Sequence, residues 1–394
     1  MTVAEHTDPI AAPGRLPHDE PPVVDGAIPP GLTGALVLTC AHPAGNAGLA
    51  PRSALLCGVR FGGGTARWLR AAGPGEGLPG RAAGAATWLR SAGPAIPGAP
   101  GGASVAPPAG DHIGAEWHTV ASYPGLDVAE HLVIGPDGAV RDARPFALEG
   151  APLMSAVALT ERFVVVFDLP VTHHRAAAML GSALPYRWRP GRPGRIGLLP
   201  RAAHDPSGPR WFPIDPCYVF EAVNAYDDRG RVVVDAVRHD RAFDTPSFDP
   251  GRDAGPARVH RWILDLASGT AAERLLIDTV EAASVDPRRA GRRHQLLFGR
   301  LAGKRAIAGR DLAAGTTQVR EAGPGRRAGR PVFVPRDTGV EGDGWIMVFT
   351  RDLAQRRSEL LVLDALNLTG PPQAVVHLPA ALPAARHTAW LAAS

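Results

Sequence analysis

Short runs of apolar residues, separated by turn-forming residues, follow one another along almost the whole chain. Several of these runs end at an aspartate that precedes a small or turn-forming residue, as expected where a strand leaves a sheet. Long stretches of helical periodicity are nearly absent. The predicted strands are Gly34–Thr39, Ala54–Phe61, Arg162–Asp168, Arg231–Arg238, His260–Leu266, Gln295–Phe298, Gly344–Phe349 and Glu359–Asp364.

Two segments have the composition of β-hairpins. The apolar run Leu132–Ile134 leads into Gly-Pro-Asp-Gly and returns through Ala139 and Val140. The second candidate is Asp228-Arg229-Gly230, which precedes the run that begins at Arg231. Asp-Gly and similar pairs between apolar runs favour tight turns that join antiparallel strands. The chain is therefore predicted to be an antiparallel all-β protein.

Many short strands at fairly even spacing are typical of a sandwich, a barrel or a propeller. With 394 residues, a seven-bladed β-propeller with blades of about 50 to 60 residues would use the chain as one domain. We expect this domain to cover residues 23–394. Residues 1–22 are predicted to be a flexible tail, and a Gly/Pro/Ala-rich insert is expected near residues 71–110.

The basic excess of the chain is carried by arginine. The formal net charge is +4, and Lys304 is the only lysine. Arginine clusters at 288–293 and 326–327 raise the question of nucleic-acid binding, but no aromatic residues interleave with them. A codon bias that favours Arg and Ala explains the clusters better, so we expect no nucleic-acid partner.

Targeting and cysteine signals point to a soluble cytoplasmic protein. Cys40, Cys57 and Cys217 are widely spaced and form no CxxC pair, which argues against a disulfide framework or a zinc site. No signal-peptide pattern and no run of about 18 apolar residues is present. We therefore expect at most peripheral contact with a membrane.

Several segments carry a family resemblance. The run Arg210–Asp228, which contains VFEAVNAYDD, resembles the "VFH..NAYDD" segment of the carotenoid cleavage oxygenases. Similar matches in the expected order are Ala158–Pro170, Val285–His294, Pro331–Arg336 and the terminal His387-Thr-Ala-Trp390. Near the start, Val24–Gly34 resembles the family's "G.IP..L.G". The match is poor between residues 70 and 115, which leaves room for shortened N-terminal blades.

The resemblance implies a seven-bladed propeller that holds Fe(II) on its axis through four histidines from different blades. Three glutamates would accept hydrogen bonds from the outer nitrogens of these rings and fix their orientation. The implied reaction is O₂-dependent cleavage of a conjugated double bond in a carotenoid, apocarotenoid or stilbene-like substrate. The implied fold class is all-β.

The resemblance implies four ligand positions. At three of them this chain has a residue other than histidine. His387, three residues before Trp390, matches the last ligand. Glu221 stands in place of the histidine of "VFH", Ser155 in place of that of "MHDF", and Pro107 in place of that of "AHP". The remaining metal ligands would be His387 and, as a weaker donor, Glu221. These are two protein ligands, whereas the familiar facial-triad iron sites use three.

The glutamates that orient the histidines are also changed in part. Glu281 matches one of them, but Arg330 occupies the position of another. A permanent cation there would repel Fe²⁺, and it could form a salt bridge with Glu221. We therefore formulate the hypothesis that Arg330 pairs with Glu221. His112, in a gap-prone loop, is the alternative first ligand if the alignment slips.

Three functions remain open. The first, which we favour, is a family member with an impaired iron site, a pseudoenzyme candidate that binds an apolar isoprenoid or aromatic molecule without cleaving it. The second is an active dioxygenase with an atypical Fe(II) site built from His387, Glu221 and a histidine near His112. The third is a non-catalytic propeller that binds a protein partner.

Overall fold

The structure is a computed structural model of the 394-residue chain. It describes residues 21–40, 55–71, 104–106, 109–110, 116–135, 139–182, 184–202, 208–244, 255–379, 381–382 and 385–393. Nearly all of the predicted N-terminal tail and most of the predicted insert lie outside the described residues, so both stay predictions.

The described strands form six antiparallel blade-like sheets, each named below from its innermost strand outward. The first three are β29 (Ala385–Ala392), β2 (Gly34–Cys40), β3 (Leu55–Gly62) and β4 (Thr65–Ala71); β5 (Ser104–Val105) with β6 (Ala109–Gly110), β7 (Trp117–Ser122), β8 (Val128–Ile134) and β9 (Val140–Ala147); and β10 (Val157–Leu159), β11 (Phe163–Asp168), β14 (Gly194–Pro200) and β15 (Arg210–Ile214). The other three are β16 (Tyr218–Asp228), β17 (Arg231–His239), β18 (Arg258–Asp265) and β19 (Thr270–Ile277); β20 (Val280–Ser284), β21 (Leu296–Leu301), β22 (Ala306–Asp311) and β23 (Thr317–Glu321); and β24 (Arg326–Ala328) with β25 (Val332–Pro335), β26 (Gly344–Asp352), β27 (Arg357–Asp364), β28 (Ala374–His377) and β1 (Val24–Gly26).

Few other elements are described. The strands β12 (Val171–His173) and β13 (Tyr186–Trp188) flank the short helix α2 (Arg175–Met179) between β11 and β14. Two 3₁₀ turns are η1 (Pro287–Arg289) and η2 (Ala302–Lys304). In the described part of the chain, no helix has the length and apolar character needed to span a membrane.

The eight predicted strands are confirmed and differ from the observed strands only at their ends. Both predicted hairpins are present as paired strands, β8 with β9 and β16 with β17. In the second turn, Arg229 and Gly230 have φ values of 46° and 82°. Positive φ at both central residues is the conformation of the type I′ turn, which is common in two-residue hairpins.

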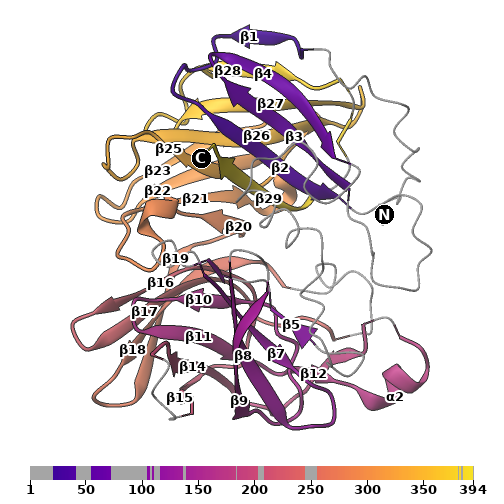
Figure 1. Cartoon of the computed structure of the whole chain (residues 1–394), viewed down its shortest axis with the longest axis vertical. Coiled ribbons are helices and arrows are strands. Elements are labelled where there is room, and N and C mark those ends of the chain that lie inside the picture. The colour runs from indigo at the N-terminus through magenta and orange to yellow at the C-terminus, as the bar shows by residue number, and fades with distance from the viewer. Residues whose placement is uncertain are drawn as a thin grey trace.

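Both chain ends join sheets formed by distant segments. The C-terminal strand β29 pairs with β2, and the N-terminal strand β1 pairs with β28. Figure 1 shows the result, with the indigo strands β2–β4 beside the yellow strands β26–β28. Leu36 and Val59 share a buried cluster with Met347 and Leu360, so apolar packing holds the two ends of the chain together.

The innermost strands of neighbouring sheets contact one another: β6 with β10, β10 with β16, β16 with β20, and β25 with β29. We call them the axial strands. Sheets arranged around such inner strands are typical of the predicted β-propeller. The solved structures compared below confirm this fold.

Candidate axial site and adjoining cavity

Irregularities in the axial strands occur at the positions that the family resemblance assigned to the site. In β16, the register with β17 shifts between Val219 and Glu221. In β20, the shift between Val280 and Ala282 leaves Glu281 as the extra residue. In β29, the register with β2 shifts next to His387. Since a β-bulge bends a strand and redirects its side chains, the backbone has special geometry at all three positions.

Glu221 forms an ion pair with Arg330, which lies just before β25. The same guanidinium donates to the carbonyl oxygen of Ala283 in β20, with Nη2 2.7 Å from the oxygen. The side chains of Glu221 and Arg330 are 21% and 34% exposed. Burial raises the pKa of the Glu221 carboxyl, and the guanidinium groups of Arg330 and Arg300 act in the opposite direction. The pairing inferred from the sequence is therefore confirmed, and it joins three axial strands or their flanks.

A second ion pair lies beside the first. Arg300 Nη2 is 3.2 Å from Glu281 Oε2, and Glu281 Oε1 accepts a hydrogen bond from the backbone N–H of Gly303 at 3.2 Å. Sequence reasoning expected Glu281 to orient a histidine ring and did not identify Arg300. We refer to Glu221, Glu281, Arg300 and Arg330 as the axial cluster.

Ser155 donates its hydroxyl to the backbone carbonyl of Val219. The contact ties the segment before β10 to β16. It also uses the only hydrogen that this side chain can donate.

The remaining predicted positions are not described at side-chain level. His387 lies on β29, with its backbone opposite Thr39 of β2, and nothing is described of its side chain. Pro107 and His112 lie outside the described residues. The structure therefore leaves the roles of these three residues as predictions.

The described donors do not fit the four-imidazole ferrous site of the family. At the two assigned ligand positions with described side chains, a serine hydroxyl and a carboxylate paired with a guanidinium replace imidazole. Among the described residues, no group of three or more His, Cys, Asp or Glu side chains is arranged to hold a metal ion. Two guanidinium groups in the axial cluster make it unfavourable for a divalent cation, because like charges repel at short range.

A second polar arrangement lies in the sheet of β16–β19, which also carries Glu221, and in the loop before β21. Arg261 donates Nε and Nη2 to the two carboxylate oxygens of Asp235, both at 2.7 Å. His294 Nε2 lies 3.0 Å from the same carboxylate. Asn224 Nδ2 lies 3.0 Å from His294 Nδ1. We call these four residues the buried network; sequence reasoning missed it, although Asn224 belongs to the segment that carries the family resemblance.

The buried network also fixes the loop at η1. Asn224 Nδ2 donates to the carbonyl oxygens of Arg289 and Arg292 at 3.0 and 2.9 Å, and Oδ1 accepts from Gly291 N at 3.0 Å. Burial would raise the pKa of Asp235, but hydrogen bonds from Arg261 and His294 lower it below its usual value. The loop is therefore held by a fully hydrogen-bonded side chain.

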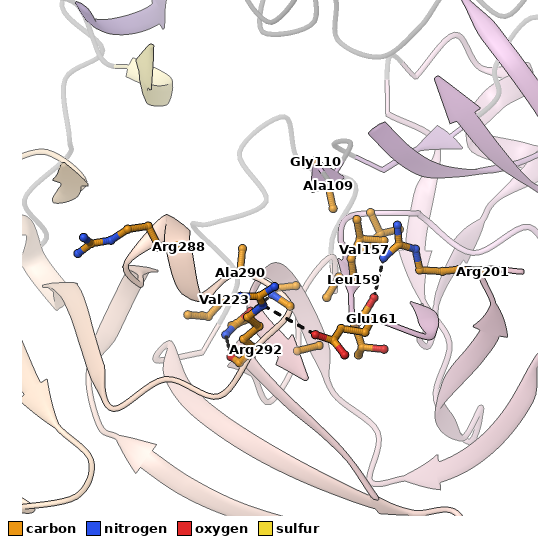
Figure 2. Close-up of a pocket in the computed structure, with 16 residues that line it drawn as sticks. Ala109, Gly110, Val157, Leu159, Glu161, Arg201, Val223, Arg288, Ala290 and Arg292 are labelled. Carbon is orange, nitrogen blue, oxygen red and sulfur yellow. Dashed lines mark hydrogen bonds and ion pairs between the residues drawn. The ribbon is translucent and has the colours of Figure 1, made fainter. Parts of the chain in front are cut away.

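This loop forms one wall of a cavity of about 370 Å³. Figure 2 shows Val223, Ala290 and Arg292 on one side, facing Val157, Leu159, Glu161 and Arg201 on the other, with Ala109 and Gly110 above. We call it the strand-end cavity. Its lining residues are Ala109, Gly110, 157–161, Arg201, 222–225, Arg288 and 290–292.

Comparisons with known proteins agree with this geometry. The sequence profile of the family described as "Retinal pigment epithelial membrane protein" matches residues 113–392. A carotenoid cleavage oxygenase of Mycobacterium tuberculosis is 30% identical over 346 residues, covering 74% of this chain and 68% of that protein. The chain belongs to the carotenoid cleavage oxygenase family.

Other members of the family are also similar to this chain. The apocarotenoid-15,15'-oxygenase of Synechocystis is 28% identical over 260 residues, covering 58% of this chain. The chain spans about half the length of this relative and of the plant carotenoid 9,10(9',10')-cleavage dioxygenases, 52% in each case.

Solved structures of the family show the same fold. The cobalt-substituted Synechocystis apocarotenoid oxygenase superposes with a TM-score of 0.75 at 20% identity, covering 95% of this chain and 96% of that chain. A lignostilbene dioxygenase of Pseudomonas brassicacearum superposes with a TM-score of 0.74 at 18% identity, covering 96% of both chains. The fold is thus the seven-bladed β-propeller, of which the described residues form six blade-like sheets.

Proposed function

We propose that this protein has an impaired iron site and binds an apolar isoprenoid or aromatic molecule with little or no cleavage. The family reaction is O₂-dependent cleavage of a conjugated double bond, and its chemistry requires Fe(II). The observation that carries the proposal is the ion pair between Glu221 and Arg330. A carboxylate that neutralises a guanidinium is a poor donor for a metal, because binding the metal would leave the arginine unpaired.

The Ser155 contact supports the same proposal. The hydroxyl donates to the Val219 carbonyl, and a neutral hydroxyl is a much weaker ligand for ferrous ion than an imidazole. Two of the assigned ligand positions thus hold side chains that form contacts within the protein instead of presenting a free nitrogen donor.

Metal analysis tests the first half of the proposal. Protein produced with added ferrous salt and purified without oxygen should contain far less than one iron per chain and consume no O₂ with an apocarotenal. Stoichiometric iron with O₂ uptake would instead favour an active dioxygenase with an atypical site.

A gain-of-metal variant sharpens this test. Ser155→His, Glu221→His and Arg330→Glu together restore the residue types that the family uses at these positions. We expect this variant to take up more iron than the natural protein. The control is Arg327→Glu, which makes the same charge change as Arg330→Glu three residues earlier in the chain, in β24.

Ligand binding tests the second half. Quenching of tryptophan fluorescence by retinal or a stilbene should saturate, and the added compound should be recovered uncleaved. If neither compound binds, the propeller is better explained as a platform for a protein partner.

A further inference from the structure

The strand-end cavity lies between two of the axial strands. All three residues of β10, Val157–Leu159, line it on one side, and residues 222–225 of β16 line it on the other, together with the η1 loop. A Cβ atom at Gly291 would lie 3.7 Å from the carbonyl oxygen of Leu159, so the loop comes close to β10. Ala222 directly follows Glu221 in the chain, and the cavity therefore reaches the part of β16 that carries the axial cluster.

The lining is mostly small and apolar. Figure 2 shows Val157 and Leu159 on one side and Val223 and Ala290 on the other. An apolar cavity of about 150 Å³ holds one benzene molecule. A volume of about 370 Å³ therefore has room for about two aromatic rings.

The charged groups at the rim are already engaged within the protein. Arg292 Nε lies 3.8 Å from Glu161 Oε1, so the two charges offset each other. Arg201, beside them, donates Nη1 to the carbonyl oxygen of Thr160 at 2.9 Å. A charged ligand would have to disturb one of these contacts to gain a partner of opposite charge.

The other polar side chains of the lining are also committed to the fold. The Arg288 guanidinium pairs with Asp286, with Nη2 2.6 Å from Oδ2, and in Figure 2 it points away from the other labelled side chains. Asn224 uses Nδ2 and Oδ1 to hold the backbone of the η1 loop. Thr160 Oγ1 accepts from two backbone N–H groups of the turn between β10 and β11. The cavity thus offers a ligand mainly apolar contact.

The wall formed by the η1 loop is fixed before any ligand arrives. Asn224 is 6% exposed, and its hydrogen bonds to the loop leave the loop backbone little freedom. A preformed wall reduces the entropy lost on binding. The shape of the cavity is therefore built into the fold.

We propose that the strand-end cavity binds a neutral aromatic molecule of about two rings with few hydrogen-bonding groups. Apolar contact favours such a molecule, whereas an ionised group buried without a partner is very costly. The inference rests on the proposed function for the binding of an apolar molecule. It adds the place where that molecule binds and the chemical class to which it belongs.

A matched pair of ligands tests the class of molecule on the natural full-length chain. trans-Stilbene has two aromatic rings and no charge, and trans-stilbene-4-carboxylate adds one negative charge to the same rings. In equilibrium dialysis, the carboxylate should bind at least about tenfold more weakly than stilbene, which corresponds to about 1.4 kcal/mol. Equal or tighter binding of the carboxylate would overturn the proposal.

A matched pair of variants tests the place. Ala290→Trp puts a large side chain into the cavity and should weaken stilbene binding at least about tenfold. Ala314→Trp is the control, because Ala314 lies in the exposed turn between β22 and β23 and does not line the cavity. An unchanged melting temperature shows that each variant is folded. The comparison of the two ligands needs no variant, so it stands even if the tryptophan disturbs the loop.

The outcomes separate this inference from the proposed function. Stilbene that binds the natural protein and Ala290→Trp equally well occupies another place, so the inference about the cavity is wrong while the binding half of the proposed function holds. If neither stilbene nor retinal binds the natural protein, both are wrong.

Discussion

The axial cluster and the buried network are two sets of polar and charged residues in neighbouring parts of the same propeller, and they differ in how deeply their side chains are buried. In the buried network, Asp235 is fully buried, and Arg261 binds both of its oxygens at 2.7 Å. In the axial cluster, the four side chains are 21% to 34% exposed. A fully desolvated pair must be completely satisfied, because an unpaired charge there is very costly. A partly hydrated cluster tolerates a change of residue type.

The two sets of residues also differ in the role of the positions that they occupy. The buried network holds the η1 loop through Asn224, which belongs to a segment that resembles the family. The axial cluster occupies positions where the family implies metal chemistry, and two of its members are arginines. If iron no longer binds, as proposed above, packing maintains the first set of residues, whereas metal binding no longer constrains the second.

Removing the buried carboxylate should have the largest effect. Asp235→Ala leaves the guanidinium of Arg261, 8% exposed, without its bidentate partner, and should lower the free energy of unfolding by about 3 to 5 kcal/mol. Urea denaturation measures this loss. Asp228→Ala is the control, because Asp228 pairs with the exposed Arg293, and the loss there should stay below about 1 kcal/mol. Equal losses in the two variants would contradict the comparison.

A third buried polar site should respond to pH. His118 Nδ1 lies 3.0 Å from His131 Nε2, and both rings are buried. Burial, as the largest cause, and then the neighbouring His118, Arg144 and Arg201 lower the pKa of His131 to about 3, while Asp142 acts in the opposite direction.

Because the unfolded chain binds this proton near pH 6.5, the contribution of His131 to stability is complete above that pH and falls as the pH drops toward 3. The expected loss at pH 5 is about 2 kcal/mol. Denaturant melts from pH 7 to pH 4 should show this slope in the natural protein and a flatter profile in His131→Phe. A profile that stays equally steep in the variant would assign the slope to other groups.

Replacing the axial ion pair with apolar residues should have a small effect. The double variant Glu221→Leu with Arg330→Met should change the free energy of unfolding by no more than about 1 kcal/mol, because both desolvation cost and attraction are removed together. Either single change should cost more than the pair, since each leaves one charge without its partner. A double-mutant cycle measures this coupling. Additive single effects would show that the pair contributes nothing.

Metal removal should have the smallest effect. A chelator should leave the melting temperature of the natural protein unchanged, because we expect the native state to hold no iron that stabilises it. If the protein had an iron site, free iron at 100 times the dissociation constant would add about 2.7 kcal/mol to the free energy of unfolding. The restored variant described above is the positive control, and a chelator should lower its melting temperature.

Most of the fold could be predicted from local sequence. The strand runs are bounded by turn residues, so β11 and β27 were located to within two residues at their ends. The two-residue turn at Arg229 and Gly230 followed from composition. By contrast, no local pattern indicated that β29 would pair with β2 or that β1 would pair with β28. Such pairings join residues hundreds of positions apart, and they depend on how the sheets come together in space.

The site was predictable only in part. The types of residue at positions 155, 221, 281 and 330 could be read directly, and their charges suggested the ion pair between Glu221 and Arg330. Arg300 was missed because it lies in β21, the second strand of its sheet, where nothing in the sequence marks it as a partner of Glu281. The rim of the strand-end cavity was also missed, since Glu161, Arg201 and Arg292 come from three separate loops.

The sequence by itself determined that this chain is built of short antiparallel strands and that two described iron-ligand positions lack histidine, because strand period, turn chemistry and residue identity are local properties. Tertiary structure alone decided which charges meet. The bulges in β16 and β20 and the contact of their flanks with Arg330 bring opposite charges together on the propeller axis. An ion pair forms only when two charged groups lie within a few ångströms of each other. The number of residues between two positions in the sequence does not determine that distance.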